Sequence, residues 1–154
     1  MTVNTAAESR VFIGTTGQAN DLTDYEADSY IEVGEVEDLG EFGDTAEEVT
    51  FTALKDRRTR KFKGSFNAGT ITIVCGSDPS DAGQDALRDA FDSDFDYNFK
   101  IMLNDAITVG GQPTILYFSG KVMSKGRNVG QVNNVVRQTF AVGINTAILE
   151  TAAT

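Results

Sequence analysis

Hydrophobic and polar residues alternate along most of this chain, a pattern typical of β-strands with one buried face. Gly34 interrupts the second alternating segment and indicates a bulge or bend there. The alternation predicts about seven or eight strands, within residues 11–13, 30–39, 49–53, 62–66, 70–75, 97–103, 115–123 and 137–148.

Two of these segments differ from simple one-sided strands. Residues 115–123 carry bulky apolar side chains on both faces, which indicates a central strand or one covered by a partner subunit. In the last segment, Phe140, Val142 and Ile144 alternate with a face of small and polar residues that includes Arg137 and Thr139. Between 53 and 62 the alternation stops at a charged stretch, which we interpret as a loop joining two strands.

One segment has helical rather than alternating spacing. Asp78 is the candidate N-cap, and Pro79 suits the first helical position. An apolar stripe follows at a spacing of three and four residues, formed by Ala86, Leu87, Ala90 and Phe91. This stripe predicts a helix of about three turns that packs on a sheet.

The elements together predict a mainly β fold, either a β-sandwich or an open barrel of about seven or eight strands with one short flanking α-helix. A chain of 154 residues fits one domain. We expect residues 10–150 to form this domain. Small polar residues at 1–9 and 151–154 predict a flexible N-terminal arm and a flexible C-terminus.

The rare residue types argue against an enzyme. The chain has no histidine and one cysteine, Cys75, so it has no internal disulfide and no set of soft ligands for zinc. The lack of histidine also removes the commonest group for proton transfer near neutral pH. Because Cys75 ends an apolar alternating run, we interpret it as a small buried hydrophobe rather than a reactive thiol. We therefore expect no catalytic residues, metal or cofactor.

Two local patterns resemble ligand motifs only in part. Residues 64–69 match the spacing of glycines in a phosphate-binding loop, but Thr70 and Ile71 stand where Lys and Ser/Thr are needed. Residues 92–96 read Asp-Ser-Asp-Phe-Asp, yet Tyr97 replaces the glycine that a calcium-binding EF-hand loop requires. A solvated turn is the better interpretation of residues 92–96.

The net charge of −10 argues against tight binding of nucleic acid, and its distribution is uneven. Residues 1–50 hold 13 of the 23 acidic groups and one base, Arg10. Six of the 13 bases cluster in the charged stretch, namely Lys55, Arg57, Arg58, Arg60, Lys61 and Lys63. Three interpretations stay open for this cluster: a contact with the acidic region of a neighbouring copy, a solvated loop, or a contact with a nucleic-acid backbone.

Neither a secretory signal nor an apolar run long enough to span a membrane is evident, so we expect synthesis in the cytosol and no membrane contact.

Several features follow one another in a fixed order: residues 38–44, the strand at 49–52, the basic and glycine-containing stretch 60–64, the strand at 69–73, and Gly83, Gln84 and Leu87 in the helix. This order resembles that of the tail tube proteins of long-tailed bacteriophages. The resemblance covers roughly residues 10–150. It implies a structural virion subunit that forms hexameric rings, whose inner sheets make one continuous barrel, and rings that stack into a conduit for DNA.

Further expectations follow from that resemblance. Residues 55–63 match the loop that contacts the next ring, so the six bases become candidates for contacts between rings. Arg137, Thr139 and Asn145 are candidates for a polar wall facing the lumen, and an acidic lumen would repel DNA phosphates. The implied partners are further copies of the chain and the tape measure, terminator and distal tail proteins, in a virion tail assembled in the host bacterial cytoplasm. A tail terminator, or the inner-tube protein of a contractile tail or type VI secretion system, is the alternative.

Overall fold

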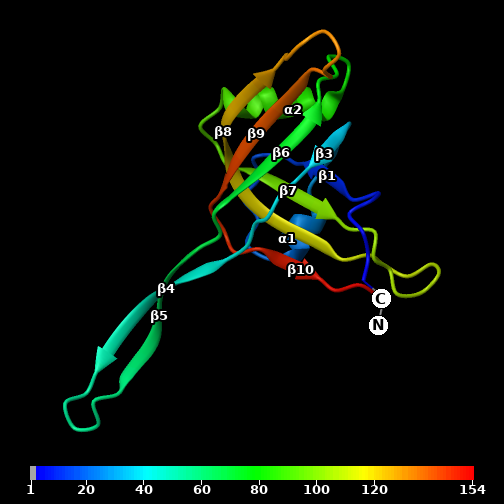
Figure 1. Ribbon diagram of the computed structural model, residues 1–154. Coiled ribbons are helices and arrows are strands. Elements are labelled where there is room, and N and C mark those ends of the chain that lie inside the picture. Colours follow the sequence, from blue (N-terminus) through cyan, green and yellow to red (C-terminus); the bar gives the residue numbers. More distant parts are fainter. Residues whose placement is uncertain (1–2) are drawn as a thin grey trace.

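The computed structural model describes residues 3–154 and contains ten strands and two helices (Figure 1). The helices are α1 (Leu22–Ala27) and α2 (Ala82–Phe91). The strands are β1 (Arg10–Ile13), β2 (Ile31–Val33), β3 (Val36–Asp38), β4 (Thr45–Thr52), β5 (Thr59–Asn67), β6 (Thr70–Gly76), β7 (Tyr97–Met102), β8 (Ile115–Asn128), β9 (Arg137–Ile144) and β10 (Leu149–Thr151). The predicted mainly β fold with a flanking helix is confirmed.

Eight strands form one curved antiparallel sheet in the order β2-β1-β7-β8-β9-β6-β3, with β10 beside β8. The segment predicted as one strand at 30–39 is two strands, because β2 pairs with β1 while β3 pairs with β6. The break falls at the predicted position, Gly34. The strand predicted at 137–148 ends at Ile144 as β9, and the short strand β10, which pairs with another part of β8, begins after it at Leu149 and was not predicted. The division of 30–39 and the additional strand β10 raise the strand count to ten.

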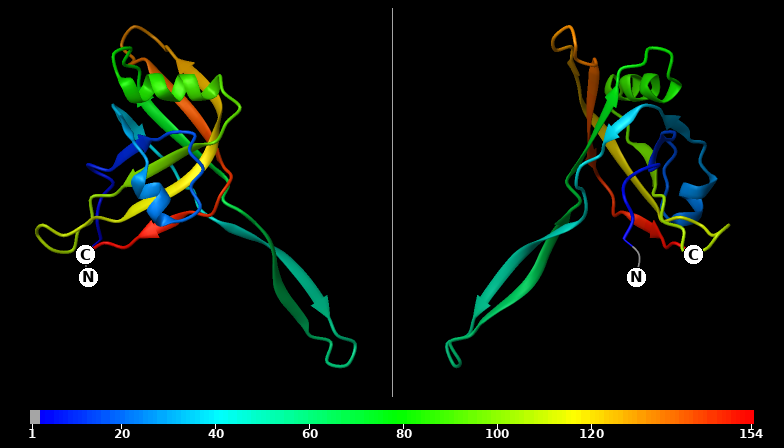
Figure 2. Two further views of the ribbon diagram at one scale, coloured as in Figure 1. Left: turned by 180° about the vertical axis from the view of Figure 1, so that it is seen from behind. Right: turned by 45° about the vertical axis from the view of Figure 1, so that its right-hand side comes forward.

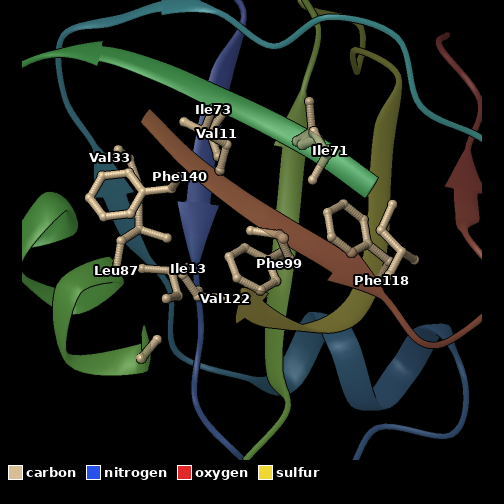
Figure 3. Close-up of a cluster of buried hydrophobic side chains, with 14 of the residues drawn as sticks. Val11, Ile13, Val33, Ile71, Ile73, Leu87, Phe99, Phe118, Val122 and Phe140 are labelled. Carbon is tan, nitrogen blue, oxygen red and sulfur yellow. The ribbon is translucent and has the colours of Figure 1, made fainter. Parts of the chain in front are cut away.

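The hydrophobic core lies inside the curve of this sheet and under α2 (Figure 3). Phe99 and Phe118 stack with their ring centroids 5.4 Å apart. Around them pack fully buried side chains from strands distant in the sequence and from the helix, including Ile13, Ile71, Ile73, Leu87, Phe140 and Val142. Alternate residues of β6 and β9 therefore face the core, as the alternation predicted.

The predicted start of α2 is wrong by three residues. Asp81 is the N-cap, and its carboxylate accepts hydrogen bonds from the backbone N–H of Gln84 at 2.9 Å and of Gly34 at 3.0 Å. Asp78 instead accepts from the backbone N–H and hydroxyl of Ser80, so Pro79 lies outside the helix. Asp81 is the cap because the same side chain also binds the break between β2 and β3.

Helix α1 was not predicted, because its six residues contain only two large apolar side chains. Tyr25 is the buried one, and its ring stacks on Tyr117 at 5.7 Å while its hydroxyl bonds to Ser119 at 3.0 Å. Asp28 at the C-cap accepts hydrogen bonds from the backbone N–H of Thr15 and from Asn98 Nδ2. One buried aromatic side chain and a polar network, rather than an apolar stripe, therefore anchor this helix.

Asp28 is expected to make the fold sensitive to acid. Burial acts to raise the pKa of its carboxyl, but hydrogen bonds from Thr15, Asn98 and Ser29 outweigh this and leave the pKa below its ordinary value. A carboxyl with a lowered pKa in the folded state stabilises the fold above its unfolded pKa of about 3.9, and this contribution disappears as the pH falls through the folded value.

The Asp28→Asn variant is therefore expected to be less stable than the unmodified chain at pH 7 and to lose less stability between pH 5 and pH 3. Urea unfolding midpoints across this pH range measure the difference. Asp94→Asn, at an exposed position, is the control. An equally steep loss in Asp28→Asn would show that this carboxylate does not contribute.

Both ends that were predicted to be flexible make hydrogen bonds to the rest of the chain. In the described part of the N-terminal arm, the Glu8 carboxylate accepts a hydrogen bond from Asn104 at 2.9 Å. The predicted C-terminal segment 151–154 begins in β10, and Thr154 N–H donates to the carbonyl of Gln112 at 2.9 Å. The structure thus gives both ends contacts with the domain.

Candidate assembly interface

Strands β4 and β5 form a separate two-stranded hairpin, residues 45–67, which projects away from the rest of the chain (Figure 2). We call this hairpin the arm and the remainder of the chain the body. Two strands flanking a charged loop were predicted here, and the pairing from Thr45↔Asn67 to Thr52↔Thr59 confirms them. The alternation also predicted a buried face, and that is wrong for the single chain, since every residue of β4 is exposed.

The arm is nevertheless amphipathic. Val49 pairs with Phe62 and is followed by Phe51, so three apolar side chains share one face. Their exposed fractions are 49%, 55% and 57%, which for large apolar residues indicates a face without a covering layer. The opposite face is polar, with Glu48 opposite Lys63, Thr50 opposite Lys61, and Thr52 opposite Thr59. Leu54 at the tip is 99% exposed.

All six predicted basic residues lie on the arm. Lys55, Arg57 and Arg58 are in the turn, while Arg60, Lys61 and Lys63 are on β5. Arg60 pairs with Asp56 at 2.9 Å, and Lys61 pairs with Glu48 at 3.7 Å. Within the described residues, the other four bases form no ion pair. Their role in contacts between rings stays a prediction.

Charge separates the arm from the body. The arm has six bases and three acids, which gives it a net charge of +3. Because the whole chain carries −10, the body carries −13. Opposite net charges on two parts of one chain favour contact between the arm of one copy and the body of another, particularly at low salt.

One part of the main sheet, β3-β6-β9-β8, has two edges at which another copy could pair. This part ends in the short strand β3 on one side. On the other side, β7 pairs with β8 only as far as Gly120, so residues 121–128 of β8 have β9 as their one strand neighbour within the described chain. Neighbouring strands in this part are antiparallel throughout, so placing β3 of one copy beside β8 of the next would continue the same pattern.

The face of β6, β9 and β8 that points away from the core carries small side chains. Thr70 and Thr72 lie beside Gly143 and Ala141, and Ser124 continues the row on β8. None of these three strands contains Asp or Glu. Of the bases on this face, Arg137 pairs with Glu37 and Lys121 pairs with Asp96 at 2.6 Å. These three strands therefore add no acidic side chain to this face.

The three residues predicted to face a lumen are only partly grouped. Arg137 and Thr139 lie on this small-residue face, both half-buried. Asn145 lies just beyond the end of β9, where its Nδ2 donates to Asp96 at 3.2 Å. The assignment of these residues to a lumen stays a prediction.

The acidic stretch 92–96 forms ion pairs with β8, and Cys75 is buried in the core. Asp96 and Asp92 pair with Lys121 and Lys125, which lie on β8. Among residues 3–154, no group of three or more acidic or cysteine side chains is placed to hold a metal ion. The interpretation of Cys75 as a buried hydrophobe is confirmed, since it is fully buried and burial raises the pKa of its thiol.

In residues 3–154, neither α1 nor α2 has the length and apolar character needed to cross a bilayer.

Known structures share this architecture. A chain of the anti-feeding prophage baseplate, a six-fold symmetrised structure, aligns over 100% of this chain and 99% of its own length, with a TM-score of 0.75 and 11% identity. The SPP1 tail tube structure aligns over 94% of this chain and 76% of its own, with a TM-score of 0.64 and 14% identity. A chain of the sheath/tube terminator of an extracellular contractile injection system, PVC, aligns over 99% of both, with a TM-score of 0.68 and 14% identity.

By sequence alone the chain matches no protein-family model and no curated protein. The similarity is thus one of fold, over almost the whole chain. The predicted resemblance to tail tube proteins is confirmed at this level, because the fold is that of tube and terminator components of tails and injection systems.

Proposed function

We propose that this chain is a structural subunit of a tail tube, and that its function is to assemble with copies of itself. The observation that carries the proposal is the arm. An isolated two-stranded hairpin is marginally stable at best in water, and this one also exposes an apolar face. A second copy that covers this face would remove both disadvantages and bring the basic arm against an acidic body.

Ring closure would use the sheet edges, because unpaired strands at the edge of a sheet are sites of pairing between chains. With β3 of one copy beside residues 121–128 of the next, the four-stranded parts of successive copies would form one closed barrel. The six-fold symmetry of the prophage baseplate supports a ring of six. Contacts made by the arms would then join one ring to the next.

The small-residue face of β6, β9 and β8 suits the wall of a conduit. Threonine, alanine, serine and glycine offer few groups that hold a phosphate backbone, and two bases on this face are already paired with carboxylates. DNA would therefore pass without specific binding. In this proposal the tube is part of a virion tail assembled in the host cytoplasm, where tape measure, terminator and distal tail proteins are its partners, and the subunit performs no catalysis.

A second candidate is a terminator or the inner tube of a contractile system, supported by the likeness to the PVC sheath/tube terminator. Both candidates require rings. Stacking of the rings of the purified protein would separate a terminator from either kind of tube, because a terminator ends a tube instead of extending it.

Negative-stain electron microscopy of the purified chain tests the proposal, with stacked rings or tubes as the expected result. The variant Arg57→Glu/Arg58→Glu/Arg60→Glu is expected to give shorter tubes while its far-UV circular dichroism is unchanged. Exposed ion pairs contribute about 0.2–1 kcal/mol each, and the loss is repeated in every copy of a ring.

The matched control replaces the same three arginines with lysine, which keeps the charge. Tubes of full length in the glutamate variant would remove these bases from the mechanism. A wild-type chain that stays monomeric at high concentration would overturn the proposed function itself.

A further inference from the structure

A groove of about 240 Å³ opens on the body between the N-terminal residues, β3 and the end of β7. Its apolar lining comes from Val36, Leu39, Phe42, Ile101 and Leu103. Leu39, Phe42 and Leu103 are only half-buried, although they pack on the core, and the ring of Phe42 lies 6.2 Å from that of Phe118. The groove is thus an opening through which the core reaches the surface.

The size and lining of this groove suit protein side chains. Pockets for small molecules commonly measure about 300–1,000 Å³ and contain several convergent polar groups. This groove is smaller, and its lining is mostly aliphatic and aromatic. One or two large apolar side chains from another protein surface would fill it and cover the exposed part of the core.

The rim of the groove is acidic. Asp38 lines it, and Glu41 lies between two lining residues, Gly40 and Phe42. Neither carboxylate forms an ion pair with a described residue. Glu37, also in the lining, is already paired with Arg137. An occupant that brings apolar side chains together with unpaired bases would match both the floor and the rim.

We infer that this groove receives the arm of a second copy of the chain. The inference rests on the proposed function and names the surface at which one copy binds the next. The arm has the required chemistry. Val49, Phe51 and Phe62 are exposed on one face of it, and the turn between its strands carries Arg57 and Arg58, which have no ion-pair partner in the described chain. The arm projects away from its own body, so its apolar face is open to a neighbour.

Cysteine cross-linking between two preparations tests the contact. One preparation carries a cysteine on the arm (Val49→Cys, Phe51→Cys or Phe62→Cys), and the other carries Asp38→Cys at the groove. The native Cys75 is buried and does not compete. A disulfide forms only where Cα atoms approach within about 4.4–6.8 Å. We expect a disulfide-linked dimer in at least one mixture, in yield about tenfold above the control.

The control pairs the same arm variants with Val132→Cys, a fully exposed position on the β8–β9 loop. Cross-linking at the groove no greater than at this control would overturn the inference. If tubes are still seen by microscopy in that case, the arm binds elsewhere and the proposed function stands. If neither tubes nor cross-links form, both fail.

A charge exchange gives an independent measure. Asp38→Lys/Glu41→Lys and Arg57→Glu/Arg58→Glu are each expected to shorten tubes, whereas the chain with all four substitutions is expected to recover most of the length. Recovery would identify the two sets of charges as partners, because additive effects are the rule for residues that do not interact. A fourfold variant no better than the two double variants would contradict the pairing.

Discussion

A chain in which residues 46–66 are replaced by Asn-Gly is expected to fold normally and to form no tubes. Thr45 and Asn67 lie opposite each other at the base of the arm, so a two-residue turn joins them in the register that they already have. The core of the body contains no residue from β4 or β5, since its buried members all lie outside this hairpin. Removing the arm therefore takes away an assembly surface and leaves the core intact.

Urea unfolding and negative-stain microscopy check the two parts of this expectation. A variant that keeps the chain length, Val49→Asp/Phe62→Asp, is expected to lose tubes in the same way, because burying a carboxylate without a partner is unfavourable. Thr50→Ala on the polar face of the arm is the control and is expected to assemble. Tubes of normal length from the chain without the arm would show that other surfaces hold the rings together.

The Gln84→Leu variant is expected to lose more stability than any surface substitution. Gln84 is fully buried in α2, and its Nε2 donates to the carbonyls of Gly34 at 3.0 Å and Gly76 at 2.8 Å. Its Oε1 accepts from the backbone N–H of Asp78 at 3.0 Å. Leucine has a similar size but would leave these three backbone groups without their partner. Each unsatisfied buried group costs about 1–3 kcal/mol, so a total of about 3 kcal/mol or more is expected.

The free energy of unfolding, from urea titration, measures this loss. Asp89→Leu is the matched control, because it introduces the same side chain at an exposed position of the same helix and is expected to change stability by less than about 0.5 kcal/mol. A loss below about 1 kcal/mol in Gln84→Leu would show that water satisfies the freed groups. Gln84 also holds Gly34, which precedes the edge strand β3 that is proposed to pair with the next copy. Weaker ring formation by this variant is therefore expected as well.

The sequence could predict the strands of the arm but not where their apolar face lies. Val49, Phe51 and Phe62 alternate with polar residues as a strand over a core does. Alternation reports only that one face of a strand is apolar, and the covering layer can belong to the same chain or to another. In this chain the tertiary structure leaves the face open, so the pattern that predicted a buried face identifies an assembly surface instead.

The two helices differ in how far local sequence could predict them. The spacing of apolar residues predicted α2. Its start was ambiguous, because Asp78 and Asp81 both precede the apolar stripe and either aspartate can cap a helix. In the structure Asp81 is the cap, and its carboxylate also accepts a hydrogen bond from the backbone N–H of Gly34, 47 positions away. Helix α1 depends on the packing of Tyr25 against Tyr117, which no short segment of sequence contains.

The sequence by itself determined the mainly β class, the strand at residues 70–75, the alternating core face of the last long strand, the burial of Cys75, and the separation of acidic and basic charge. These follow from local periodicity and composition, which depend on residues close together in the chain. The tertiary structure decided which strands are neighbours, that the basic arm projects from the body, and that the groove beside β3 has an acidic rim. Those features depend on contacts between distant segments, whose partners are fixed only when the sheet forms.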